Sequence, residues 1–262
     1  MTLPPLTAWE PFAGIGGFAL AAKQIGGFNW TSLENNPAAI AVLQSNFDHP
    51  ILAQDIRTFH PEFKAYNLMV GGFPCGGTSK AGTRKGLAHS QSSLFREFLR
   101  CIEEGLPSYV VLEQPIGFEH RGLKAWVGGM TKLGYSTLDP ILLSGALINI
   151  QVERLRMYII SYLNEPETLK GQPRGWGKQL EMLIENEQSK EDTLSIAWEN
   201  GVLIPKFPLE LQTSYKPSLS VPPKYPGRMT SRILSGKTIV VAQARIILSL
   251  VYYLYWQRLS LC

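Results

Sequence analysis

The segment Glu10-Pro11-Phe12-Ala13-Gly14-Ile15-Gly16-Gly17-Phe18 decides the fold, because a glycine-rich turn there joins an apolar run to a helical pattern. Residues 7–12 have the composition of a buried strand, and residues 18–25 repeat apolar side chains at helical spacing. Glycines at such a turn let the backbone approach a ligand closely, and the helix N-terminus adds oriented N–H groups. The same turn can also serve packing alone, so the segment by itself leaves both roles open.

The alternation of short apolar runs and helical patterns continues through the first two-thirds of the chain. We expect strands at residues 7–12, 29–33, 68–72, 109–112, 136–143 and 156–163, with a further strand ending near Asp55, and helices at residues 18–25, 37–47, 93–104 and 123–133. This rhythm is typical of βα units. It predicts an α/β fold with a mostly parallel, Rossmann-like sheet flanked by helices.

The composition and the periodicity of the sequence change after residue 163. Residues 164–228 are rich in Pro, Gly, Lys and Glu and have weak periodicity, whereas residues 236–256 return to an apolar, helix-like run. We therefore predict one α/β domain made of residues 1–163 and 230–262, a small module at 164–229, and a final helix that packs back on the α/β domain.

Composition narrows the class of protein only partly. With 262 residues, 45% of them apolar and 18% charged, the chain can bury a large core. A net charge of +4 suits a phosphate-bearing partner but is equally common in metabolic enzymes. The three cysteines are far apart, which favours a reducing compartment. No signal peptide or membrane span is recognisable, so we expect a soluble, cytoplasmic protein without membrane partners.

Two acidic residues stand where successive strands are expected to end. Glu34 closes the second strand, and Asp55 lies near the end of the third. Carboxylates in these places fit hydrogen bonding to the ribose hydroxyls and the adenine amino group of a nucleoside. The alternative is a solvated acid and a helix cap, because Asn36-Pro37 begins the next helix.

A cysteine occupies a polar, glycine-rich loop after the fourth strand. Cys75 lies within residues 71–82, with Lys80, Arg84 and Lys85 close by in sequence, and nearby cations favour the nucleophilic thiolate. Lone cysteines are more often buried apolar residues, which is our interpretation of Cys101. Glu113 ends another strand, and strand ends of such a sheet converge. Cys75 and Glu113 could therefore face one pocket.

In their order along the chain, these motifs resemble those of DNA cytosine-5 methyltransferases. The resemblance covers roughly residues 7–163 and 230–257 and is carried by residues 12–18, Glu34, Asp55-Ile56, Pro74-Cys75, Ser93-Leu94-Phe95, Glu113, Arg154-Leu155-Arg156 and residues 236–240. It implies a catalytic domain that binds S-adenosylmethionine (SAM), formed by 1–163 and 230–262, and a target-recognition region at 164–229. No metal is implied.

The resemblance also assigns residue roles. The target cytosine would be flipped out of the helix, Cys75 would attack C6, Glu113 would contact N3 and the exocyclic amine, and Arg154 and Arg156 would position the base and a phosphate. The implied cofactor site consists of Phe12, Ala13, Gly14, Ile15, Gly16, Gly17, Glu34, Asn35, Asp55 and Ile56, with Gly72, Pro74, Leu94 and Thr238 at the methionine end.

Several positions depart from the family pattern, among them Gly76, Thr78, Gln114, Pro115, Asn35, Gln151 and Lys237. The motif that begins Arg-x-Leu-Thr is not recognisable. The nucleophile, the acid and both arginines are nevertheless present, which favours an active enzyme.

The expected recognition region is short for this family. It pairs cations with aromatics at Tyr215-Lys216 and Lys224-Tyr225, as a phosphate-contacting surface would. Residues 181–199 are acidic and are interpreted as a solvated helix that faces away from DNA. Three hypotheses stay open: a DNA enzyme, the same chemistry on RNA, and a catalytically silent subunit that binds SAM or nucleic acid. A restriction endonuclease or a helper subunit is a possible partner.

Overall fold

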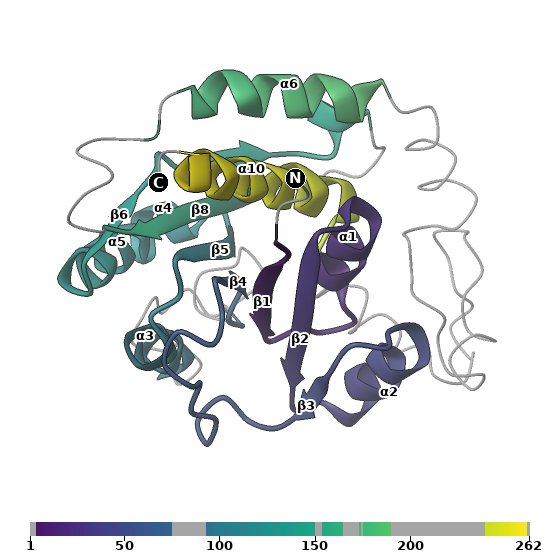
Figure 1. Ribbon diagram of the computed structural model, residues 1–262, viewed down its shortest axis with the longest axis vertical. Helices are drawn as coiled ribbons and strands as arrows, with labels where there is room; N and C mark the ends of the chain where they lie inside the picture. The colour runs from purple at the N-terminus through teal and green to yellow at the C-terminus, as the bar shows by residue number, and fades with distance from the viewer. Residues whose placement is uncertain are drawn as a thin grey trace.

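A mixed sheet forms the centre of the molecule (Figure 1). The computed structural model describes residues 4–74, 93–149, 154–164, 173, 175–189 and 239–260. Within these ranges the sheet has eight strands in the order β3-β2-β1-β4-β5-β8-β6, and β7 pairs with β8 off this path. The strands are β1 (Leu6–Pro11), β2 (Phe28–Glu34), β3 (Ile51–Ala53), β4 (Leu68–Gly71), β5 (Tyr109–Pro115), β6 (Tyr135–Thr137), β7 (Ile141–Leu143) and β8 (Arg156–Leu163).

The first five strands are parallel to one another, and β8 runs antiparallel to β5, β6 and β7. The predicted α/β class with a mostly parallel sheet is therefore confirmed. The single strand expected at 136–143 is instead two strands, β6 and β7, separated by residues 138–140. Pro140 lies in this break, and proline has no N–H to donate to a sheet ladder.

Helices cover both faces of the sheet. They are α1 (Gly17–Ile25), α2 (Pro37–Asn46), α3 (Ser93–Gly105), α4 (Phe118–Arg121), α5 (Leu123–Lys132), α6 (Trp176–Gln188) and α10 (Val241–Ser260), with a short 3₁₀ turn η3 (Ala146–Ile148). The start of α2 follows from its sequence: Asn36 accepts hydrogen bonds from the N–H groups of Ala38 and Ala39, and Pro37 occupies the first turn. The four helices expected in the first half of the chain are present.

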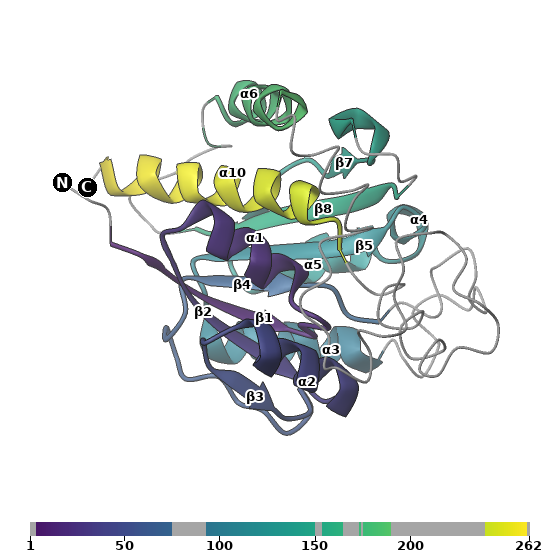
Figure 2. The ribbon, with the colours of Figure 1, turned by 90° about the vertical axis from the view of Figure 1, so that its right-hand side faces the viewer.

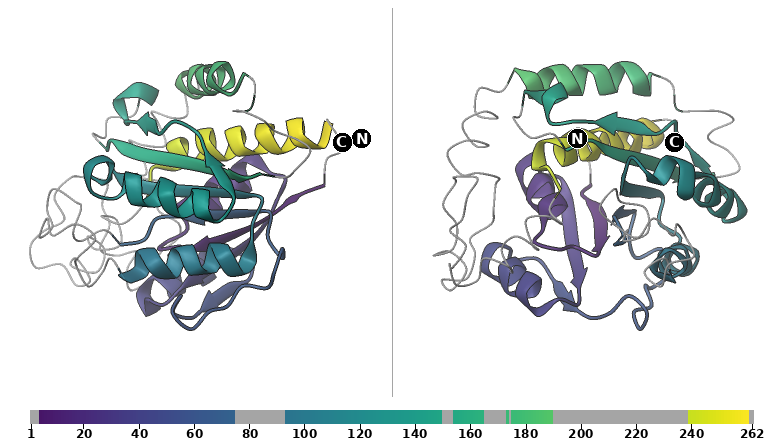
Figure 3. Two further views of the ribbon diagram at one scale, coloured as in Figure 1. Left: turned by 90° about the vertical axis from the view of Figure 1, so that its left-hand side faces the viewer. Right: turned by 180° about the vertical axis from the view of Figure 1, so that it is seen from behind.

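Two apolar cores lie on opposite faces of the sheet. On one face, α1 and α10 cover residues such as Val111 and Tyr158. On the other face, α3 and α5 bury Phe98 and Trp126 against β4 and β5. Figure 2 shows α1 and α10 side by side, and the left panel of Figure 3 shows α3 and α5 on the opposite side. The alternation of side chains along each strand produces this division.

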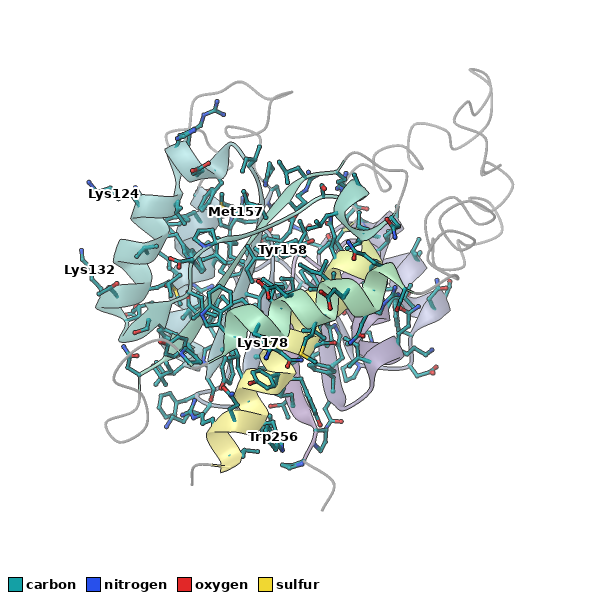
Figure 4. The ribbon with its side chains drawn as sticks, turned by 90° about the horizontal axis from the view of Figure 1, so that it is seen from above. Lys124, Lys132, Met157, Tyr158, Lys178 and Trp256 are labelled. Atoms are coloured by element: carbon teal, nitrogen blue, oxygen red, sulfur yellow. The ribbon has the colours of Figure 1, made fainter. Side chains whose placement is uncertain are left out.

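The last helix packs back on the sheet domain, as expected. It contacts α1 on one side and α6 on the other (Figure 4, where Lys178 marks α6 and Trp256 marks α10). Across the ranges given above, none of the helices combines the length and the apolar character that a membrane span requires.

Helix α6 falls within the predicted recognition region but packs on α10. Glu187 of α6 is 3% exposed and forms an ion pair with Arg245 of α10. Residues 181–188 are thus helical, as the interpretation of 181–199 required, but one of their acids is buried rather than solvated. Residues 190–199 lie outside the described part, and the boundaries of the recognition region stay a prediction.

Candidate active site

The predicted site residues follow the carboxyl ends of the parallel strands. The chain leaves β1 toward β2 on one side, while β4 pairs with β1 on the other, so the order of strands reverses between β1 and β4. Ligands of open α/β sheets bind outside the carboxyl ends at such a reversal. Phe12 and Gly14 follow β1, Glu34 ends β2, Gly72 follows β4, and Glu113 lies near the end of β5.

The glycine turn after β1 combines two roles. Gly16 has φ 86° and an added Cβ there would lie 2.5 Å from the ring of Phe47, while a Cβ on Gly17 would meet the side chain of Ile239. These two glycines permit close packing. Gly14 has φ 58°, and no described atom lies within 4 Å of the Cβ position. Only Gly14 therefore faces space that a ligand could enter.

Glu34 is held at this turn by three backbone N–H groups. Its Oε2 accepts a hydrogen bond from Gly14 at 2.8 Å, and its Oε1 accepts from Asn35 and Asn36, both at 2.9 Å. The side chain of Asn36, and not that of Glu34, caps helix α2. The carboxylate thus links the ends of β1 and β2.

The next predicted residues lie beside Glu34. The Asn35 amide donates to Asp55 Oδ2 at 3.0 Å, and Arg57 forms an ion pair with the same oxygen at 3.2 Å. Ile56 is buried, and its carbonyl accepts a hydrogen bond of 2.6 Å from Arg100 of α3. Arg100 also binds the carbonyl of Phe59 at 3.0 Å and so fixes the loop after β3. The sequence offered no signal for this contact, since Arg100 resembles any helix surface cation.

Glu113 and the two arginines form the second part of the site. Arg156 Nε lies 2.8 Å from Glu113 Oε1, and both side chains are mostly buried. Burial raises the pKa of Glu113, and the charges of Arg156 and Arg154 oppose this rise. Burial also lowers the pKa of Arg154, as does the neighbouring Arg156. The result is a desolvated carboxyl group whose protonated form is favoured more than in an exposed glutamate.

Gly72 is required by the position of this carboxyl group. A Cβ on Gly72 would lie 2.5 Å from the Glu113 carbonyl and 2.7 Å from Glu113 Oε2. Phe73 is buried among aromatic rings, and its carbonyl accepts a hydrogen bond of 3.2 Å from the buried amide of Gln114. Gln114, a departure from the family pattern, thus holds the chain two residues before Cys75.

The structure brings the predicted residues together in two groups. One contains Gly14, Glu34, Asn35 and Asp55, and the other contains Gly72, Glu113 and Arg156, with Arg154 near enough to influence the carboxyl charge. Cys75 and Thr238 lie outside the described residues. The other predicted residues are placed as follows: buried at Ala13 and Ile15, half-buried at Phe12 and Leu94, and exposed at Pro74.

Sequence reasoning missed Glu10, a buried acid beneath the glycine turn. It is 2% exposed and accepts a hydrogen bond of 3.0 Å from the indole of Trp30. Burial raises its pKa to about 8, against the opposing effects of Trp30 and of the first N–H groups of α1. An acid directly after the apolar pair Ala8-Trp9 in the strand Leu6–Pro11 was the available signal.

The strand order, the glycine turn and the acids at the ends of β2 and β5 define a Rossmann-like α/β protein of the methyltransferase type. Residues 6–216 match the family model for C-5 cytosine-specific DNA methylases. Because this match spans most of the chain, the protein belongs to the C-5 cytosine-specific DNA methylase family.

Curated relatives agree with this assignment. The chain is 33% identical over 161 residues to the type II methyltransferase M.Bsp6I of Bacillus sp. (strain RFL6), covering 58% of this chain and 51% of the relative. It is 30% identical over 160 residues to the type II methyltransferase M.HpaII of Haemophilus parainfluenzae, covering 58% and 44%. The matched part thus spans about half the length of these relatives.

Solved structures support the fold. A Dnmt2 methyltransferase from S. pombe aligns with a TM-score of 0.52 at 22% identity, covering 68% of this chain and 60% of that one. A DNMT2 mutant from Spodoptera frugiperda aligns with a TM-score of 0.61 at 14% identity, covering 95% and 100%. At these identities the likeness extends to the fold alone.

Proposed function

We propose that this protein transfers a methyl group from SAM to C5 of a flipped-out cytosine in DNA, through a covalent bond between Cys75 and C6. The observation that supports this best is the buried Glu113–Arg156 pair at the carboxyl end of β5, 2.8 Å apart. The pair lies at the same sheet edge as the glycine turn. In this pair, Glu113 could contact the cytosine ring and Arg156 could balance the charge of the Glu113 carboxylate, both beside the candidate cofactor site.

The described residues fit a nucleoside cofactor. No described atom lies within 4 Å of the Cβ position of Gly14, and the Glu34 carboxylate beside it can accept hydrogen bonds from ribose hydroxyls. Asn35 and Asp55 present polar groups at the neighbouring strand end, where an adenine would lie. When bound, SAM supplies an electrophilic methyl group. The proposed chain residues bind and orient it, with Gly72, Pro74, Leu94 and Thr238 at its methionine end.

Glu113 would act on the ring as Cys75 attacks. The thiolate forms a bond to C6, and the displaced electron pair moves toward C5 and N3. A protonated Glu113 carboxyl group can donate to N3 and stabilise this charge, and its raised pKa favours that form. C5 would then take the methyl carbon as the bond between that carbon and sulfur breaks, which leaves S-adenosylhomocysteine, and the N3 proton would return to Glu113. A base would remove the C5 proton, and the electron pair of that C–H bond would re-form the C5–C6 double bond and expel the Cys75 thiolate.

The two arginines would hold the base and a neighbouring phosphate. Arg156 is fixed by Glu113 at the start of β8, and Arg154 lies two residues before that strand. Guanidinium groups suit this task because they remain charged and present several donors in one plane. We also propose SAM as the cofactor of this protein. The proposed protein partner is a restriction endonuclease or a helper subunit.

Covalent trapping tests the proposal. Incubation with SAM and an oligonucleotide containing 5-fluorocytosine should give an adduct that survives denaturation, because C5 then carries fluorine in place of the proton that must leave. Cys75→Ala should abolish the adduct. DNA and RNA oligonucleotides of the same sequence are compared. If only the RNA oligonucleotide is trapped, the substrate is RNA and not DNA. If neither oligonucleotide is trapped, the result favours a catalytically silent subunit.

A further inference from the structure

A buried amide of the last helix reaches the segment that carries both arginines. Gln243 of α10 is 0% exposed. Its Nε2 donates to the carbonyls of Leu143 and Arg154, both at 3.0 Å, and its Oε1 accepts from the hydroxyl of Tyr158 at 3.0 Å. Both amide N–H groups and the amide oxygen are therefore used. A buried amide is costly unless it is satisfied in this way.

The partners of Gln243 flank Arg156. Arg154 precedes it by two residues, and Tyr158 follows it by two residues on the same face of β8 (Tyr158 is labelled in Figure 4). In the sheet, Tyr158 lies opposite Glu113. Gln243 thus holds both ends of a five-residue segment, 154–158, whose middle residue binds Glu113.

The contact to Arg154 acts where the sheet ladder has ended. The β5–β8 register runs to the pair Pro115–Arg156, so Arg154 lies beyond it. Its carbonyl takes a hydrogen bond from α10 in place of one from β5. The contact to Tyr158 is durable, because burial raises the pKa of this phenol well above its ordinary value and its hydroxyl remains a donor.

Anchoring of α10 alone does not require this amide. Ile246, Ile247, Leu250 and Val251 of the same helix are fully buried in the same core and supply apolar packing. We propose that Gln243 is a positioning residue for methyl transfer: it fixes the backbone of Arg154 and the ring of Tyr158 so that both arginines face Glu113. This inference rests on the proposed function of the same site.

The test compares Gln243→Met with Leu250→Ala. Methionine matches the length of glutamine without its donors, and Leu250→Ala disturbs the same helix while leaving the hydrogen bonds to Arg154 and Tyr158 in place. With saturating SAM and DNA, and at a temperature where both variants are folded, single-turnover methyl transfer should fall about 10–100-fold in Gln243→Met, the scale for misplaced catalytic groups. In Leu250→Ala it should stay within about threefold of wild type, because that change costs stability and not alignment.

A second variant covers the case in which Gln243→Met does not fold. Gln243→Glu keeps the acceptor for Tyr158, and its carboxyl group donates one hydrogen bond only when protonated. The ratio of the Gln243→Glu transfer rate to the wild-type rate, measured at each pH, should therefore rise as pH falls. A ratio that is independent of pH would contradict the inference, since the donor to Arg154 or Leu143 returns only when the carboxyl group is protonated.

Hydrogen exchange separates the inference from the proposed function. Amides of residues 154–158 should exchange about tenfold faster in Gln243→Met than in wild type, with little change in β1, because only the local opening is affected. If wild type forms no adduct with 5-fluorocytosine, the proposed function fails and exchange alone decides the positioning role. If exchange rises equally throughout the chain, or if both helix variants lose transfer alike, Gln243 is a structural residue only.

Discussion

Glu113→Gln is the sharpest probe of the proposed chemistry. The change keeps the shape of the side chain and an acceptor for Arg156, but it removes the ionisable carboxyl group. Arg156 Nε lies 2.8 Å from Oε1, and after the change the charged guanidinium still donates, now to a neutral amide oxygen. Because the donor stays charged and burial already disfavours the Glu113 carboxylate, we expect stability to change by no more than about 1 kcal/mol, less than the contribution of one hydrogen bond to a charged group.

The expected effect on rate is larger than the effect on stability. Loss of one preorganised electrostatic contact in the transition state costs on the order of 10²–10³ in rate. The SAM contacts proposed for Gly14 and Glu34 lie at the ends of β1 and β2, on the other side of β4 from Glu113, so cofactor affinity should change little.

The assay is single-turnover methyl transfer to an oligonucleotide, with SAM affinity measured by calorimetry in parallel. A fall of less than about tenfold in transfer, together with a collapse of SAM binding, would assign Glu113 to the cofactor site. If both values stay near those of wild type, another group must bind N3 and the reasoning is refuted. A variant of the exposed Glu119 in the next helix, Glu119→Gln, is the matched control.

Three further predictions concern Cys75, Glu34 and Glu10. Cys75→Ala should abolish methylation and leave SAM affinity within a few-fold, because the thiol acts on the base; near-native transfer would refute the mechanism. Glu34→Ala should weaken SAM binding by roughly 1–3 kcal/mol in calorimetry, and unchanged affinity would make Glu34 a purely structural link between β1 and β2. Burial raises the pKa of Glu10 from 4.5 to about 8, so the folded state binds a proton that the unfolded state has released, and stability should fall as pH rises through this window. Glu10→Gln should remove this slope, at most roughly 1.4 kcal/mol per pH unit, and denaturant unfolding at pH 5 and pH 8 measures it; equal slopes in both proteins would contradict the raised pKa.

Much of the sheet could be predicted because its strands are buried on both faces. Such strands appear as short apolar runs, and the acids that end them are conspicuous in the sequence. Glu34 and Glu113 could thus be assigned to one sheet edge from their order alone. The break between β6 and β7 was missed although Asp139-Pro140 marks it in the sequence, because the β-branched Thr137 and the apolar residues 141–143 together have the composition of one strand.

The contacts that support the site could not be predicted in the same way. Gln243 lies 89 residues from Arg154, and Gln24 and Arg245, which lie 221 residues apart, likewise give no sign in the sequence that their side chains meet. In the sequence, Gln243 is an isolated polar residue in an apolar helix. Only the packing of α10 against the sheet shows that the residue has partners, because such pairs depend on tertiary structure and not on local pattern.

The place of α10 in the core sets the order in which this chain can fold during synthesis. The glycine turn is made within the first 20 residues, yet Gly17 packs against Ile239 and the adjoining face of the sheet is covered by α10. A ribosome must therefore release the chain to beyond residue 239 before the glycine turn is fully packed. Until then the nascent protein presents the apolar face of α1 to the cell, and chaperones have their opportunity to bind it there.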